Sequence, residues 1–263
     1  MEYHPLITSR KEIRLLTITT TTPLISCTLT HHSLSPTAPP PTYSALSYVW
    51  GRPQDTIDVL VNGHPTPITL NLFRALEQLG SESQGYLWVD ALCINQNDTA
   101  EKRREVMRMG HIYSRAGQVV AWLGPATVEA QSAFRLIRCL WREIFDPTYT
   151  TEEKALQSLE NQKWVESCKA MGQLCQLPYW NRTWIIQEVA LAQVLIFRCG
   201  TLTCSGKQLF NAVDVSPFAT YGTEKTENWA DVLSGEDYVS METVRGLKTF
   251  RKPCITARGL SGA

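Results

Sequence analysis

Glu188 is the residue whose surroundings point most clearly to chemistry. It lies in YWNRTWIIQEVALA, residues 179–192, where most other side chains are aromatic or aliphatic. Burying an ionised carboxylate without a partner is costly, so such a group is usually ion-paired, protonated or placed to act on a ligand. A helix over these residues puts Trp180, Trp184, Glu188 and Ala192 on one face, four residues apart. We therefore expect Glu188 to be shielded from water.

Two interpretations of Glu188 stay open at this point. In the first, its carboxylate meets Arg182, Arg198 or a backbone donor and is a satisfied polar group. In the second, it works in a cleft lined by tryptophan, with a raised pKa or with a sugar hydroxyl to bind.

Asp90 is the second candidate. The segment YLWVD places it at the carboxyl end of an apolar strand, where open α/β sheets bind their ligands. The alternative is a turn or helix cap, because the following DALCINQND is rich in Asp and Asn, which favour such positions. Both interpretations remain open.

Other catalytic patterns are missing from the sequence. There is no Gly-x-Gly-x-x-Gly and no P-loop, and Ser47 lacks the Gly-x-Ser-x-Gly elbow. No histidine stands in a motif that would partner Cys93. The 8 cysteines contain no Cys-x-x-Cys pair, so we expect free thiols and no metal site. The charge run EKRREVMR, residues 101–108, reads as a solvated helix face.

The order of elements indicates an α/β fold. Residues 13–20, 24–32 and 43–50 read as strands, and Asn62-Gly63 is a strong hairpin turn. Apolar strands at 86–94, 118–124 and 194–200 then alternate with helices at 71–80, 97–116, 130–145, 152–177 and 179–192. This alternation predicts a mostly parallel sheet flanked by helices, with a β-rich N-terminal extension.

Composition narrows the class of partner and the compartment. Lys+Arg and Asp+Glu number 25 each among 263 residues, so the net charge is zero and a nucleic-acid partner is not expected. The first residues lack the apolar core of a signal peptide, and no apolar run is long enough for a membrane span. A cytoplasmic protein is expected.

Three ordered blocks carry a family resemblance. YSALSYVWG, LWVDALCINQND with the following EKRREVMRMGHIYSRAGQVVAWLG, and YWNRTWIIQEVALA resemble the hallmark blocks of the fungal heterokaryon incompatibility (HET) domain. The resemblance implies a role in non-self recognition and programmed cell death, with a homo-oligomer or a signalling partner. We expect the domain over residues 1–215, with a β-rich lead-in at 1–42 and an α/β core at 43–204. Residues 216–263 form an unassigned tail, which suggests a truncated or minimal form.

HET domains in turn look like distant relatives of Toll/interleukin-1 receptor (TIR) domains, which implies a TIR-like, flavodoxin-like fold. On that resemblance Glu188 takes the catalytic position of NAD-cleaving members. Trp184 would stack on a ring, and Asp90, Ser47 and Tyr48 would line the same cleft. NAD is then a substrate, and no bound cofactor is expected.

Three functional hypotheses follow from these resemblances. The chain cleaves NAD or a related nucleotide through Glu188, or it is a non-enzymatic death-signalling module that acts by self-association or partner binding, or it is an inactive remnant. The first predicts that changing Glu188 abolishes toxicity without unfolding the chain.

Overall fold

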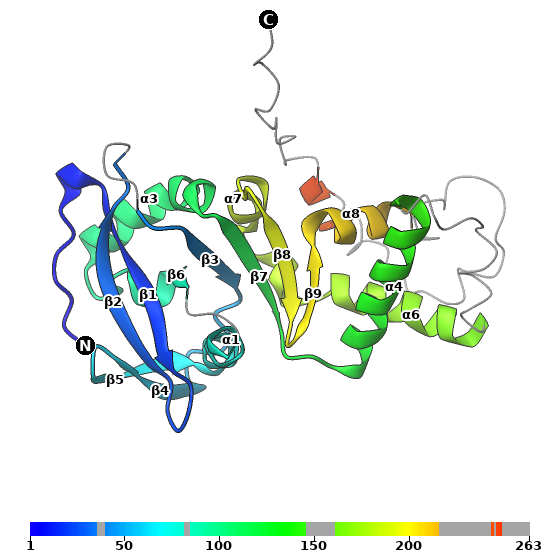
Figure 1. The fold of residues 1–263 in the computed structure, drawn as a ribbon, viewed down its shortest axis with the longest axis horizontal. Helices are drawn as coiled ribbons and strands as arrows, with labels where there is room; N and C mark the ends of the chain where they lie inside the picture. The colour runs from blue at the N-terminus through cyan, green and yellow to red at the C-terminus, as the bar shows by residue number, and fades with distance from the viewer. Residues whose placement is uncertain (36–39, 82–84, 146–160, 216–242, 245, 249–263) are drawn as a thin grey trace, which may run out of the picture.

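The protein forms one nine-stranded sheet with helices packed around it (Figure 1). The computed structural model describes residues 1–35, 40–81, 85–145, 161–215, 243–244 and 246–248. The predicted tail at 216–263 lies almost wholly outside the described residues, as does the first part of the predicted helix at 152–177. In chain order the strands are β1 (Glu12–Thr20), β2 (Ser26–Ser33), β3 (Tyr43–Tyr48), β4 (Thr56–Val61), β5 (His64–Thr69), β6 (Tyr86–Trp88), β7 (Gln118–Gly124), β8 (Leu195–Cys199) and β9 (Leu202–Ser205).

The sheet is mixed, which corrects the prediction of a mostly parallel sheet. Its order is β5-β4-β2-β1-β6-β3-β7-β8-β9. The four central strands β6, β3, β7 and β8 run parallel to one another. The β1–β2 hairpin joins them antiparallel through Leu16 and Leu87, and the β4–β5 hairpin extends the same edge. The β-rich extension therefore adds strands to the core sheet. Its strand β1 pairs with β6, so the edge of the parallel core is not left with unpaired backbone groups.

Different helices pack against different parts of the sheet. α1 packs against β1, β4, β5 and β7, whereas α3 packs against α7. α4 packs against α6, α8 and β9, far from the β1–β2 hairpin (Figure 1). The helical elements are η1 (Thr8–Arg10), α1 (Leu70–Gly80), α2 (Asp90–Cys93), α3 (Thr99–Arg115), α4 (Val128–Phe145), α6 (Asn161–Cys175), η2 (Pro178–Asn181), α7 (Ile185–Ala190) and α8 (Gly206–Val215).

Local signals explain several boundaries. Asn62 and Gly63 have φ of 50° and 78°, the left-handed pair that a tight hairpin needs, and they join β4 to β5 as predicted. Asp98 caps α3 by accepting hydrogen bonds from the backbone N–H groups of Ala100 and Glu101. No helix in the described ranges is both long and apolar enough to cross a membrane.

The charge run on α3 is a solvated face only in part: Lys102 and Arg103 are exposed as predicted, but its two glutamates are not. Glu101 and Glu105 are buried. Arg14 on β1 donates to both oxygens of Glu101, at 2.6 and 3.0 Å, and Arg108 donates to Glu105 at 2.8 Å. Backbone N–H of Asn95 also donates to Glu101 at 2.8 Å. The Arg14–Glu101 pair holds α3 and the loop before it against β1, a contact that the local charge pattern does not reveal.

The segment 179–192 is not one continuous helix. It divides into η2 and α7, and between them Arg182 is extended, with φ −76° and ψ 133°. As a result Trp180 is buried while Trp184 is 44% exposed, so the two tryptophans do not share a face. The polar Asn-Arg-Thr run supplies little apolar surface to hold a helix, and the Arg182 side chain turns inward instead.

Candidate functional site

Glu188 is wholly buried on α7 and is held by Arg182. Arg182 Nη1 donates to Glu188 Oε2 at 2.7 Å, and Nη2 donates to Oε1 at 2.8 Å. This is the bidentate arrangement of a guanidinium and a carboxylate, which is stronger and more directional than a single bond. Ser47 Oγ on β3 also donates to Oε2. The pairing with Arg182 that the sequence left open is therefore present.

Ser47 and Tyr179 extend this buried network. The Ser47 and Tyr179 hydroxyls lie 2.6 Å apart, and Arg182 Nη1 donates to Ser47 Oγ at 3.1 Å. The Arg182 guanidinium stands 5.6 Å from the centre of the Tyr179 ring. Burial opposes the charge of Arg182, but Glu188 outweighs it and raises the pKa of Arg182. β3, η2 and α7 are thus joined by one charged cluster.

Asp90 lies at the start of α2, two residues after the end of β6, and is partly exposed. Trp50 Nε1 donates to Asp90 Oδ2 at 2.8 Å, and the backbone N–H of Ala91 donates to Oδ1 at 2.8 Å. Burial raises the pKa of Asp90 to about 6; the hydrogen bond from Trp50 lowers it, and the charge of Glu188 raises it again. The two predicted carboxylates therefore lie close enough to influence each other.

A cleft of about 400 Å³ opens at Asp90, and we call it the Asp90 cleft. Its polar and aromatic wall contains Trp50, Asp90, Gln96, Lys102, Arg182 and Trp184. The cleft combines two tryptophan rings, two cationic side chains and one carboxylate. Such a mixture suits a ligand that has both flat apolar and charged parts.

The structure separates the five predicted site residues into two groups. Asp90 and Trp184 line the Asp90 cleft. Ser47, Tyr48 and Glu188 are buried and do not line it. The Tyr48 hydroxyl has no hydrogen-bond partner within the described ranges; burial and the nearby Asp90 both raise its pKa.

Sequence reasoning missed most of the residues that line the cleft, among them Trp50, Gln96, Lys102 and Arg182. Trp50 lies two residues after β3, the strand that carries Ser47, so its position near a strand end was a usable signal. Lys102 sits in a run of charges, where nothing distinguishes it from its neighbours. Arg182 was considered only as a partner of Glu188, because its place in the cleft depends on the break between η2 and α7.

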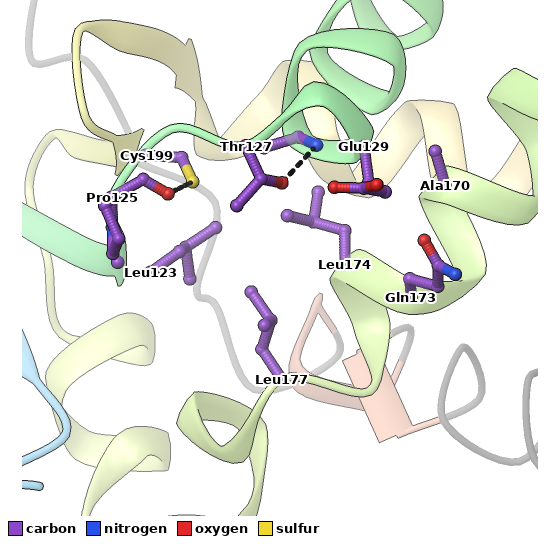
Figure 2. Close-up of a pocket in the computed structure, with 11 residues that line it drawn as sticks. Leu123, Pro125, Thr127, Glu129, Ala170, Gln173, Leu174, Leu177 and Cys199 are labelled. Atoms are coloured by element: carbon purple, nitrogen blue, oxygen red, sulfur yellow. Dashed lines mark hydrogen bonds between the residues drawn. The ribbon is translucent and has the colours of Figure 1, made fainter.

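A second cavity of about 350 Å³ lies at the carboxyl end of β7, between α4 and α6 (Figure 2). Leu123, Leu174 and Leu177 form much of its wall, and no predicted site residue reaches it. The Cys199 thiol donates to the Pro125 carbonyl at 3.1 Å, and burial raises its pKa to about 11. A thiol with so high a pKa is a poor nucleophile. This cavity is therefore a weaker candidate than the Asp90 cleft.

No group of three or more His, Cys, Asp or Glu side chains stands close enough to hold a metal ion in the portion of the chain that the structure describes.

The fold is an α/β domain with a cleft at the carboxyl ends of central parallel strands, and comparison places the chain in a family. Residues 43–188 match the family model described as heterokaryon incompatibility protein (HET). The chain belongs to the HET family, and all five predicted site residues fall within the matched range.

One curated relative is heterokaryon incompatibility protein 6, OR allele, of Neurospora crassa. It is 32% identical over 216 residues, which cover 68% of this chain and 32% of the relative. The chain therefore spans about a third of the length of this relative. No solved structure gives a significant match.

Proposed function

We propose that this chain acts in heterokaryon incompatibility, the fungal non-self recognition that leads to programmed cell death, and that the Asp90 cleft binds and cleaves NAD or a related nucleotide. Family membership and the name of the Neurospora crassa relative support the biological part. One observation carries the chemical part. A carboxylate, Asp90, shares a cleft with two exposed tryptophans and lies beside the Arg182–Glu188 pair.

The strand order supports a TIR-like arrangement of the central sheet, and with it the proposed position of the site. Numbered along the chain from β3, the parallel strands β6, β3, β7 and β8 follow the order 2-1-3-4. Flavodoxin-like sheets use this order and bind ligands at the carboxyl ends of their strands. The Asp90 cleft lies at the ends of β3 and β6, where Trp50 and Asp90 follow those strands.

The proposed reaction breaks the bond between nicotinamide and its ribose. The electron pair of this bond leaves with nicotinamide, water adds to the ribose carbon, and one proton is released, so that ADP-ribose is formed. A carboxylate beside the ribose stabilises the positive charge that develops there. Trp50 and Trp184 offer flat surfaces for the nicotinamide ring.

Asp90 is the carboxylate that lines the cleft, so we assign it the direct role. Glu188 has no exposed surface, and both its oxygens accept hydrogen bonds from Arg182. In this arrangement Glu188 acts through Arg182 as a positioning residue. Its predicted role as the catalytic residue stays a prediction, and direct contact with substrate requires Arg182 to move away.

The test measures total NAD in cells induced to express the wild-type chain, Asp90→Asn or Glu188→Gln. Folding of each variant is checked by circular dichroism on purified protein. NAD is expected to fall with the wild-type chain and to stay constant with Asp90→Asn. Folded wild-type protein that leaves NAD unchanged contradicts the enzymatic proposal. A Glu188→Gln chain that still depletes NAD excludes Glu188 as the catalytic residue.

A second candidate function is non-enzymatic death signalling by self-association or partner binding. Four apolar side chains in and around α7 are 41–47% exposed: Trp184, Ile186, Leu191 and Val194. Exposed apolar patches of this kind often mark interaction surfaces. Under this function cells die with NAD intact, and Asp90→Asn remains toxic. An inactive remnant would leave both the cells and their NAD unaffected.

A further inference from the structure

Arg182 uses only part of its hydrogen-bonding capacity with the residues that the structure describes. A guanidinium has five N–H donors. Nη1 donates to Ser47 and Glu188, and Nη2 donates once, to Glu188. The Nε–H and the second Nη2–H, which form the side edge of the guanidinium, donate to no residue in the described ranges. The side chain is 17% exposed and lines the Asp90 cleft.

This side edge is a fork suited to an oxyanion. Two parallel N–H groups of arginine match two oxygens of a carboxylate or phosphate. The adjacent edge of the guanidinium, formed by Nη1 and Nη2, is already fixed by Glu188, so the fork is held in place before any ligand arrives.

Lys102 supplies a second cation to the same cleft. It lies in the first turn of α3, and its side chain is exposed. Its ammonium group makes no hydrogen bond or ion pair with the residues that the structure describes. A lysine near a helix N-terminus adds to the positive potential of the helix end, which favours bound anions.

Other cleft groups indicate what the anion is attached to. The Gln96 side-chain carbonyl oxygen is buried without a hydrogen-bond donor among the described residues, and it fits a hydroxyl donor. Trp50 and Trp184 are 39% and 44% exposed and present ring surface to a ligand. An anion, a hydroxyl group and a flat ring together describe a nucleotide.

We propose that Arg182 and Lys102 form a phosphate subsite in the Asp90 cleft, and that the cleft selects nucleotides by their phosphate groups. This inference rests on the proposed function in one respect, namely that the cleft takes a nucleotide. It concerns binding and not bond cleavage, so the two can fail separately.

The test compares ADP with adenosine by isothermal titration calorimetry on the purified chain. ADP is expected to bind more tightly than adenosine, and high salt is expected to weaken ADP binding only. Lys102→Gln and Arg182→Lys should each weaken ADP binding about tenfold, the order of magnitude of one charge-assisted hydrogen bond, and leave adenosine unchanged. Arg103→Gln is the matched control, because Arg103 is an exposed neighbour on α3 that does not line the cleft.

The outcomes separate this subsite from the enzymatic proposal. Equal binding of ADP and adenosine, no ADP binding, or equal effects of Lys102→Gln and Arg103→Gln would overturn the subsite, even when the chain depletes NAD. Phosphate-dependent binding that Lys102→Gln and Arg182→Lys weaken, and that Arg103→Gln does not, supports the subsite even when NAD is not cleaved. Lysine is chosen at residue 182 because it keeps a cation beside Glu188. If the Arg182→Lys variant does not fold, the result is decided by Lys102→Gln alone.

Discussion

Arg182 and Glu188 face each other in parallel, with two N–H···O bonds of 2.7 and 2.8 Å between guanidinium and carboxylate. They are six residues apart in the sequence: Arg182 lies in the break between η2 and α7, and Glu188 lies on α7. The pair forms part of the wall between the Asp90 cleft and the buried end of β3. It therefore links the stability of the domain to the shape of its candidate site.

Arg182→Met should destabilise the chain by about 3–5 kcal/mol, because the substitution leaves Glu188 buried without a cation. The measurement is urea-induced unfolding of the purified protein. Arg103→Met, on the exposed surface of α3, should change the unfolding free energy by less than about 0.5 kcal/mol. The double variant Arg182→Met/Glu188→Gln should recover part of the loss, because no ionised group is then left unpaired. An Arg182→Met chain as stable as the control would mean that the ion pair contributes nothing.

The pKa of Asp90 gives a prediction with a defined sign. In the folded chain it is raised from 3.8 to about 6. Between these pH values the folded chain keeps a proton that the unfolded chain has lost, so stability falls as the pH rises through this window. Asp90→Asn cannot titrate, so its stability relative to the wild type should increase from about pH 4 to about pH 7.

Unfolding curves of wild type and Asp90→Asn at several pH values check this prediction. Asp58→Asn corrects for the general effect of removing one carboxylate, because Asp58 is exposed on β4. A stability difference between wild type and Asp90→Asn that does not vary with pH would show that Asp90 has an ordinary environment.

Kinetics on purified protein should separate Asp90 from Glu188. If Asp90 stabilises the developing charge, Asp90→Asn lowers the kcat of NAD cleavage by about 100-fold or more and leaves ADP binding nearly unchanged. If Glu188 acts through Arg182, Glu188→Gln raises KM more than it lowers kcat. The reverse pattern, with kcat lost only in Glu188→Gln, would identify Glu188 as the carboxylate that contacts substrate.

Two glycines on helices should respond in opposite directions to alanine. A Cβ at Gly110 in α3 would meet Leu191 Cδ1 at 3.2 Å, and that side chain is 41% exposed and can shift. Gly110→Ala should therefore stabilise the chain by about 0.5–1 kcal/mol, as expected for alanine in a helix interior. A Cβ at Gly80 would meet Thr21 Cγ2 at 2.6 Å and Ile18 Cγ2 at 2.7 Å.

Gly80→Ala should accordingly destabilise the chain by about 1–3 kcal/mol, because Ile18 is buried and cannot move away freely. Thermal unfolding of the two variants beside the wild type gives both signs in one experiment. Stabilisation of both variants would mean that helix propensity outweighs the close contacts at Gly80. Destabilisation of both would mean that Leu191 does not shift to make room for a Cβ at residue 110.

Local sequence patterns were sufficient for much of the framework. The Asn62-Gly63 turn, the strand at 118–124 and the position of Asp90 after a strand were all predicted and are all present. Each depends on interactions within a few residues: a left-handed backbone pair, an apolar run ended by glycine, or a carboxylate at the start of a helical turn. The family could also be recognised, because its blocks are continuous segments of chain.

Tertiary structure decided the rest. The sequence offered both Arg182 and Arg198 to Glu188, but Arg198 Nε donates to the Gly200 carbonyl at 2.9 Å. Ser47 joins the same carboxylate from 141 residues away. The mixed sheet and the burial of Glu101 against Arg14 likewise follow from which strands become neighbours. The periodicity of a sequence indicates which face of a helix or strand is apolar. The partner of a buried charge is instead decided by which strands and helices pack within hydrogen-bonding distance of it.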